Sequence, residues 1–300
     1  MDKLQKLLSS SSVVLADGAM GTMLFEAGLG PGDSPQVWNV THPERIRAVH
    51  RAYLQAGSRL LLSNTFGSNR FRLSRHDLQS QVAELNLAGA SLLKAEIAAG
   101  GDLALAAGDI GPSGELMAPL GLLQYADAVE AFSEQAAALV SGGVDFIWIE
   151  TMSAVQEVQA AIEGVRKISA DIPIVVTMTF ERHGRTMMGV SPEQAWKGLG
   201  NLGIAALGGN CGTGPEELLN VIGALRALAP DLPLVFKPNA GVPVLVDGKT
   251  AYSATADTMA LSARRAVEAG ARIVGACCGS TPDHIRAMRD YLPADPHLPG

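Results

Sequence analysis

The residues best suited to chemistry in this sequence are its three cysteines, which lie in two short glycine-flanked segments. Cys211 lies in the first segment, and Cys277 and Cys278 lie in the second. Each segment follows an apolar run, 204–207 or 272–276, that predicts a β-strand. Two adjacent thiols and a third far upstream do not form a disulfide framework, but they would form a three-thiolate metal site if the two strand ends met in space. Zinc suits such a set, and three protein ligands leave its fourth position for a substrate.

The adjacent pair places a condition on the backbone. Neighbouring side chains of a regular strand point to opposite faces, so Cys277 and Cys278 can reach one ion only if the chain bends there. Gly275 and Gly279 would permit that bend. The alternative is that all three thiols are buried as small apolar side chains, which is the usual environment of a free cysteine. Their joint position at strand ends, among glycines, favours the metal site.

The composition allows a large core and shows no electrostatic signature of nucleic-acid binding. Hydrophobic residues make up 47% and charged residues 18% of the 300 residues, and the net charge of −7 predicts no binding to nucleic acid or to an anionic membrane. No run of about 18 apolar residues could span a bilayer, and residues 1–12 lack the apolar core of a signal peptide. We therefore expect a cytoplasmic protein, in a compartment where clustered thiols bind metal more often than they pair.

Apolar runs alternate with helical segments along the whole chain, which predicts an α/β fold. The runs show no polar alternation, as expected for a parallel sheet that is buried on both faces. Eight strand–helix units fit a closed (β/α)8 TIM barrel, whereas an open doubly wound sheet would favour a G-x-G-x-x-G fingerprint that is missing after the first strand. We expect a single domain over 1–300, with an N-terminal helix in 1–12 and a loose tail at 293–300. The predicted strands are 13–16, 60–66, 103–107, 146–150, 174–178, 204–207, 234–236 and 272–276.

Polar residues collect where the predicted strands end, which is where barrel enzymes place their active sites. Asp17 before Gly18, and Asn239, are also plausible turn formers. Glu150 has no such role, because it ends the apolar run 146–149 with no turn residue beside it. The polar residues at the strand ends are Asp17, Asn64, Thr65, Asp109, Glu150, Thr151, Asn210 and Asn239.

A barrel mouth with a metal, carboxylates and amides predicts a small zwitterionic substrate. The carboxylates would hold an ammonium group, and the amides and backbone N–H groups would hold a carboxylate. A metal-bound thiol is deprotonated, whereas few free thiols are ionised at neutral pH, so the site favours attack of a thiolate on an alkyl group. Hydrolysis at zinc fits less well, because no histidine lies at a strand end. We expect most of the histidines to be solvated; they are His42, His50, His76, His183, His284 and His297.

Six short segments, spread along nearly the whole chain, resemble motifs of the homocysteine S-methyltransferase family and occur in the same order as in that family. The resemblance implies a zinc-dependent (β/α)8 barrel that methylates homocysteine to methionine. The pattern of one cysteine followed much later by an adjacent pair is highly specific. The six segments are 17–22 (Asp-Gly-Ala-Met-Gly-Thr), 63–66 (Ser-Asn-Thr-Phe), 108–112 (Gly-Asp-Ile-Gly-Pro), 150–151 (Glu-Thr), 209–212 (Gly-Asn-Cys-Gly) and 275–279 (Gly-Ala-Cys-Cys-Gly).

The resemblance also implies roles for individual residues. It implies that Cys211, Cys277 and Cys278 bind one zinc ion, whose last position takes the homocysteine sulfur. It implies that Asp17 and Glu150 are the catalytic carboxylates and bind the amino group of homocysteine. The other substrate-binding residues that we expect at the mouth are Gly18, Asn64, Thr65, Asp109, Asn210 and Trp38.

The methyl donor stays open among three classes that the resemblance implies: betaine, S-methylmethionine, or a methyl-corrinoid charged from methyltetrahydrofolate. Trp38 lies near one position of the aromatic cage that holds betaine in animal enzymes, but Gly67 and Thr151 stand where those enzymes place tyrosines. Segment 108–115 looks more like the first module of cobalamin-dependent methionine synthases, while 33–39 looks equally like bacterial betaine–homocysteine methyltransferases. The resemblance implies that a corrinoid would be carried either by a separate partner protein or by a part of a larger methionine synthase that is cut away here.

Two other functions fit less well. One is a non-catalytic module that binds zinc and homocysteine as the acceptor half of a multi-protein methyltransferase. The other is a barrel aldolase or phosphate enzyme. That enzyme would need a phosphate loop, which is missing, and a strand-end lysine, for which Lys237 alone qualifies.

Overall fold

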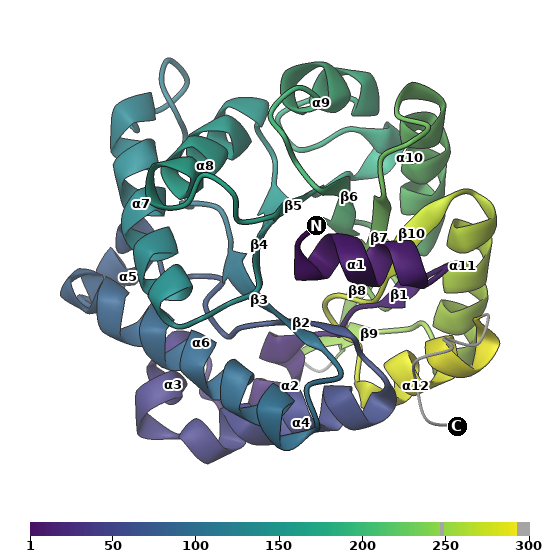
Figure 1. Ribbon diagram of the computed structural model, residues 1–300, viewed down its shortest axis with the longest axis horizontal. Coiled ribbons are helices and arrows are strands. Elements are labelled where there is room, and N and C mark those ends of the chain that lie inside the picture. Colours follow the sequence, from purple (N-terminus) through teal and green to yellow (C-terminus); the bar gives the residue numbers. More distant parts are fainter. Residues whose placement is uncertain (247–248, 293–300) are drawn as a thin grey trace.

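The computed structural model describes residues 1–246 and 249–292, and its centre is a barrel of eight parallel strands (Figure 1). Neighbouring strands follow the order β1-β10-β7-β6-β5-β4-β3-β2. An isolated parallel bridge between Ala16 and Leu60 joins the first strand to the second and closes the ring. The closed barrel expected from the sequence is therefore confirmed. The barrel strands are β1 (Val14–Leu15), β2 (Leu60–Leu62), β3 (Leu105–Ile110), β4 (Phe146–Met152), β5 (Ile174–Met178), β6 (Ala206–Cys211), β7 (Leu234–Pro238) and β10 (Ala271–Val274).

Several strand limits differ from those predicted, and β6 shows the reason. The sequence predicted a strand at 204–207, whereas β6 runs on through Gly208 and Gly209 to Cys211. A Cβ atom at Gly208 would lie 2.0 Å from the carbonyl oxygen of Val235 on β7, so this position accepts only glycine. The glycines therefore mark a close approach between two strands and not the end of a strand.

Helices surround the barrel and connect its strands (Figure 1). Four of them, α4, α9, α10 and α12, begin with proline, whose missing N–H is no loss in the first turn. The helices are α1 (Lys3–Ser10), α2 (Met20–Glu26), α3 (Trp38–Thr41), α4 (Pro43–Ala56), α5 (Arg70–Ser74), α6 (Val82–Ala99), α7 (Tyr125–Ser141), α8 (Val155–Ile168), α9 (Pro192–Leu199), α10 (Pro215–Leu228), α11 (Ala256–Glu268) and α12 (Pro282–Tyr291).

Alternate residues of each strand pack into two separate cores. In β4, Phe146 and Trp148 belong to the core inside the barrel, while Ile147 and Ile149 belong to the core between the sheet and the helices. All four side chains are fully buried, which explains why the strands read as continuous apolar runs. The interior is thus a packed core, as in other barrels of this kind, and a site can form only at its ends.

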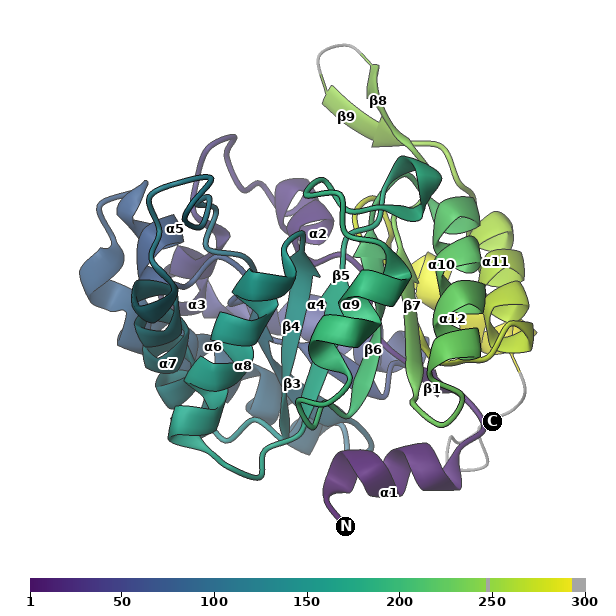
Figure 2. The ribbon, with the colours of Figure 1, turned by 90° about the horizontal axis from the view of Figure 1, so that it is seen from above.

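The first helix covers one end of the barrel. Leu4, Leu7 and Leu8 of α1 pack into the inner core. Asp2 caps the helix, and its side chain and that of Gln5 bond each other's backbone N–H groups. Figure 2 shows α1 on the side of the barrel opposite to the hairpin that follows β7. The carboxyl ends of the strands lie at the other, uncovered end.

That hairpin was not predicted from the sequence. It consists of β8 (Pro243–Val246) and β9 (Lys249–Tyr252), which pair antiparallel and project beyond the mouth of the barrel (Figure 2). Each strand has only four residues, Gly241 lies just before the first, and the first begins with Pro243, so the segment resembles a loop in sequence. The hairpin returns the chain to the mouth at Tyr252.

His50 is an exception to the expectation that most histidines are solvated. It lies on α4 with no exposed surface, and neither ring nitrogen has a hydrogen-bond partner among the described residues. Ile46, Val49 and Tyr53 are buried with it at the spacing of one helical face. The helical spacing of the apolar residues therefore indicated that His50 is buried. The polarity of histidine had suggested instead that it is solvated.

The other histidines differ in their surroundings. His42, His76 and His183 are exposed, as expected. His284 is half-buried, and its ring contacts the hydroxyl of Thr281 at 3.0 Å and a backbone carbonyl at 3.1 Å. His297 and the predicted tail at 293–300 lie outside the described residues. Within 1–246 and 249–292, no helix combines the length and hydropathy needed to cross a bilayer.

Candidate active site

The three cysteines meet at the carboxyl end of the barrel. Cys211 ends β6, and Cys277 and Cys278 follow β10, on the far side of β7. The Cys211 sulfur lies 2.9 Å from that of Cys277 and 4.0 Å from that of Cys278, and all three sulfurs lie within 4.8 Å of one another. Tetrahedral zinc–sulfur bonds of about 2.3 Å would separate the sulfurs by about 3.8 Å. Small side-chain rotations would meet this requirement, so the set could hold a metal ion.

The bend that the sequence required at the adjacent cysteines is present. Regular strand structure in β10 ends at Val274. The N–H of Cys277 donates to the carbonyl of Pro238 at 2.7 Å. The carbonyl of Cys278 accepts from the N–H of Ala240 at 2.9 Å. Both cysteines are therefore anchored to the end of β7, which brings them towards β6.

Two residues with left-handed backbone conformations complete this arrangement. Gly279 has a φ of +80°, and a Cβ atom there would lie 2.1 Å from Cγ of Tyr252. Only glycine therefore allows the turn beneath the tyrosine ring. Cys211 itself has a φ of 58°, which is uncommon for a residue other than glycine and is found preferentially at functional sites.

Asn210 connects the cysteines to β4. Its side-chain oxygen accepts the backbone N–H of Thr151 at 2.8 Å, and its amide nitrogen donates to the hydroxyl of Thr151 at 2.7 Å. The same nitrogen lies 3.5 Å from the sulfur of Cys211 and 3.8 Å from that of Cys277. Asn210 thus holds the irregular end of β4 and offers hydrogen-bond donors to the sulfurs.

The sulfurs influence one another's ionisation. The pKa of Cys278 is lowered to about 3, because the thiols of Cys211 and then Cys277 donate to its sulfur. The pKa of Cys211 is raised, because its thiol is held by hydrogen bonds to Cys277 and Cys278. Without a metal, the cluster therefore favours one thiolate and two thiols. A bound cation would be needed to ionise all three thiols.

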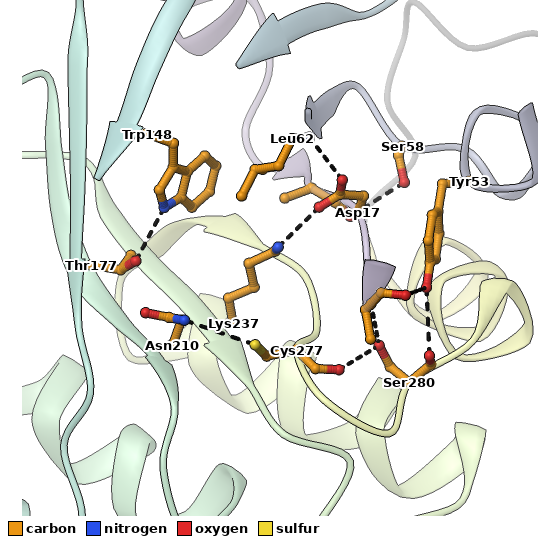
Figure 3. Close-up of polar contacts among 12 residues, drawn as sticks. Asp17, Tyr53, Ser58, Leu62, Trp148, Thr177, Asn210, Lys237, Cys277 and Ser280 are labelled. Carbon is orange, nitrogen blue, oxygen red and sulfur yellow. Dashed lines mark hydrogen bonds and ion pairs between the residues drawn. The ribbon is translucent and has the colours of Figure 1, made fainter. Parts of the chain in front are cut away.

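A buried ion pair lies inside the barrel, near the cysteines (Figure 3). The ammonium nitrogen of Lys237 lies 2.9 Å from Oδ1 of Asp17, and the backbone N–H of Leu62 donates to Oδ2 of Asp17 at 2.8 Å. Burial alone would lower the pKa of Lys237, but the charges of Asp17 and Glu150 outweigh burial and raise it above its ordinary value. Lys237 is therefore a permanent cation at this position.

Two further carboxyl groups, Asp109 and Glu150, lie at the same mouth. Burial raises the pKa of Glu150 to about 8, and burial followed by the charge of Glu150 raises the pKa of Asp109 well above its usual range. Oδ1 of Asp109 and Oε2 of Glu150 are buried and accept no hydrogen bond from any described residue. These atoms are suited to receive a hydrogen-bond donor from a ligand.

Asn64 and Thr65 are engaged in contacts within the protein. The side-chain nitrogen of Asn64 donates to the carbonyl of Pro35 and to the side chain of Asn39, both at 2.9 Å. The hydroxyl of Thr65 donates to the carbonyl of Asp109 at 2.8 Å. Both residues therefore join loops at the mouth, and their hydrogen-bonding groups are directed at neighbouring backbone and side chains.

Gly18 and Trp38 are also accounted for by packing. A Cβ atom at Gly18 would lie 2.6 Å from the hydroxyl of Ser280 and 2.8 Å from the ring of Tyr53, so no side chain fits there. Trp38 is 7% exposed, and the guanidinium of Arg45 lies 4.8 Å above its ring. One face of this ring is thus already covered by a cation.

Lys237 was the main omission of the sequence analysis, which considered it only as an aldolase residue. It occupies an inward position of β7, two residues after the inner-core residue Val235, and its ammonium lies 5.6 Å from the ring centre of Trp148. Trp148 in turn donates from its indole nitrogen to the hydroxyl of Thr177 at 3.1 Å. A charged residue at an inward position of a buried strand was the available signal, because such a charge requires a partner.

Comparison with known proteins gives concordant results. A family model described as homocysteine S-methyltransferase matches residues 14–292. Methionine synthases from Mycobacterium leprae and Mycobacterium tuberculosis are each 32% identical, over 92% and 93% of this chain. These alignments cover 24% of each relative, so the chain spans about a quarter of their length.

Solved structures show the same architecture. The oxidized form of the homocysteine methyltransferase MmuM from Escherichia coli superposes with a TM-score of 0.81 at 25% identity, over 97% of this chain and 100% of that chain. The metallated form of MmuM superposes with a TM-score of 0.82 at 24% identity, over 96% of this chain and 99% of that chain. The barrel predicted from the sequence is confirmed by these likenesses, and the matching family model is the one that the motifs resembled.

Proposed function

Since the chain belongs to the homocysteine S-methyltransferase family, we propose that it transfers a methyl group to the sulfur of homocysteine and forms methionine. One observation supports this proposal above all others. Three cysteine sulfurs within 4.8 Å of one another share a barrel mouth with buried carboxyl groups. This combination suits an acceptor that carries both a thiol and an ammonium group.

Cys211, Cys277 and Cys278 would hold a zinc ion, for which a set of three thiolates is well suited. Zinc supplies a positive charge that keeps an acceptor thiol deprotonated at neutral pH. Asn210 holds two of the cysteine sulfurs in place through its side-chain amide. The carboxyl groups of Asp17, Asp109 and Glu150 form the acidic set from which the ammonium ligands would come.

The chemical step is a displacement at the methyl carbon, whose bond to the donor is replaced by a bond to the acceptor sulfur. A lone pair of the acceptor thiolate forms the sulfur–carbon bond while the bond between the methyl group and its donor breaks, and the donor keeps that electron pair. No proton moves in this step, so the protein's part is to orient the thiolate and to exclude water. Holding the two reactants in line is worth a large share of the barrier in such reactions.

The first donor proposed here is S-methylmethionine, one of the three classes that the family resemblance implies. Trp38 is buried, and Arg45 covers one face of its ring, so that face is not free to hold the cationic group of either betaine or a sulfonium. A second proposal follows from the match to 24% of each methionine synthase. In that case the chain would be the acceptor half of a larger system, another part of which would deliver a methyl-corrinoid.

Metal analysis and a donor screen test these proposals. The purified protein should contain about one zinc per chain, and Cys278→Ala should lose both the zinc and methionine formation. Ser262→Ala, a buried substitution on α11 away from the mouth, is the matched control and should retain both. Turnover of homocysteine with S-methylmethionine alone supports the first proposal, and turnover only with a methyl-corrinoid supports the second. Full zinc content in Cys278→Ala would refute the metal assignment.

A further inference from the structure

The hairpin that follows β7 brings one aromatic side chain back to the cysteines. Its strands β8 and β9 form a separate two-stranded sheet that projects beyond the mouth of the barrel (Figure 2). Tyr252 is the last residue of β9 and pairs with Pro243, the first residue of β8. Tyr252 therefore lies at the base of the hairpin, where the two strands join the barrel.

The chain just after Tyr252 is fixed to the backbone of the cysteine segment. The N–H of Ala254 donates to the carbonyl of Ala240 at 3.0 Å, and the N–H of Ala240 donates to the carbonyl of Cys278 at 2.9 Å. The ring of His284 on α12 contacts the carbonyl of Ala254 at 3.1 Å. These contacts set the position of the tyrosine relative to Cys278, although the rest of the hairpin extends away from the barrel.

The side chain of Tyr252 contacts the cysteine segment in two ways. A Cβ atom at Gly279 would lie 2.1 Å from Cγ and 2.3 Å from Cδ2 of Tyr252, so the ring lies directly on the backbone that follows Cys278. The thiols of Cys211 and Cys277 lower the pKa of Cys278 most. A hydrogen bond from the hydroxyl of Tyr252 to the same sulfur lowers it further.

The three sulfurs thus receive hydrogen bonds from two different elements. The amide nitrogen of Asn210 on β6 lies within reach of the sulfurs of Cys211 and Cys277. The sulfur of Cys278 receives its hydrogen bond from the hairpin instead. Hydrogen bonds to metal ligands orient those ligands and adjust their strength as donors.

We infer that Tyr252 is a positioning residue of the metal centre, whose hydroxyl orients the sulfur of Cys278 and whose ring shields that sulfur from water. This inference rests on the proposed function, because it concerns the support of the proposed zinc site. It also gives the hairpin a role, since the hairpin carries the tyrosine to a cysteine on the far side of β7 from Cys211.

Alkylation of the reduced, metal-free protein tests the shielding without zinc or methyl transfer. Tandem mass spectrometry after treatment with iodoacetamide gives the rate at which each cysteine is labelled. Cys278 should be labelled severalfold faster in Tyr252→Ala than in the wild type, because its sulfur becomes accessible. The rate at Cys211 should stay within twofold of the wild type, which shows that the variant remains folded.

Zinc binding tests the role of the hydroxyl. Tyr252→Phe keeps the ring, and competition with a chromophoric chelator should show about 10-fold weaker zinc binding. With cobalt in place of zinc, the sulfur-to-cobalt charge-transfer band should move to longer wavelength, because a thiolate that loses a hydrogen bond gives up electron density more readily. Tyr125→Phe is the matched control, since it removes a hydroxyl that donates to Glu163 at 2.9 Å between α7 and α8, and it should change neither quantity.

The outcomes separate the inference from the proposed function. Wild-type zinc affinity and an unmoved cobalt band in Tyr252→Phe would overturn the inference, as would unchanged labelling of Cys278 in Tyr252→Ala. A wild-type protein that binds no zinc would refute the proposed metal centre and the positioning role with it. Faster labelling of Cys278 in Tyr252→Ala would support the shielding even then.

Discussion

Replacement of Asn210 by alanine is the sharpest test of how the metal centre is supported. The residue is 1% exposed and joins the irregular end of β4 to two of the cysteine sulfurs. Asn210→Ala removes an acceptor from the N–H of Thr151 and a donor from the sulfurs of Cys211 and Cys277. We expect a folded protein with a weakened metal site.

The magnitude follows from these two losses. An unsatisfied buried N–H costs about 1–3 kcal/mol, and since the bond to Thr151 is only partly buried, we expect a loss of about 1–2 kcal/mol in the stability of the metal-free protein. Residues that hydrogen-bond to metal ligands typically contribute about 10- to 100-fold to metal affinity. That range corresponds to about 1.4–2.7 kcal/mol of binding free energy.

Two measurements separate these effects. Urea unfolding of the metal-free protein gives the change in stability, and competition with a chromophoric chelator gives the zinc affinity. Asn201→Ala, at an exposed asparagine just after α9, is the control and should change neither quantity. Wild-type zinc affinity in a folded Asn210→Ala protein would refute the role assigned to the amide.

Two further predictions concern stability. The pKa of His50 is lowered to about 4 by burial, from an ordinary value near 6.5, so its contribution is complete above pH 6.5 and is lost as the pH falls towards 4. Between pH 7 and 5, urea unfolding should show the wild type losing about 2 kcal/mol more than His50→Leu, and equal losses would contradict this origin. Leu4 of α1 is fully buried in the inner core, and Leu4→Ala should cost about 2–5 kcal/mol in the same assay. Leu122→Ala, at a side chain that is 94% exposed, should stay within about 0.5 kcal/mol of the wild type, and an equally small effect at Leu4 would mean that α1 does not seal the barrel.

The sequence alone was sufficient for those features that depend on local pattern. Apolar runs that alternate with helical segments predicted the barrel, because strands buried on both faces and separated by helices have few other arrangements. The rule that barrel sites form at the carboxyl ends of strands was enough to place the cysteines, Asp109 and Glu150 at one mouth. Sequence reasoning failed where one residue type can indicate two environments. Gly208 suggested the end of a strand but lies inside β6, and His50 suggested a solvated residue but is buried in a core.

Only the tertiary structure could decide how the charges at the mouth pair with one another. Asp17 and Lys237 are far apart in the chain, and they become partners because β1 and β7 lie on either side of β10 in the closed ring. An inward-pointing lysine must neutralise its charge inside the barrel, and Asp17 supplies the opposite charge at 2.9 Å. The sequence thus determined which residues reach the mouth. The geometry of the ring determined which of them remain available to a ligand, since that depends on distances across the barrel that no local pattern encodes.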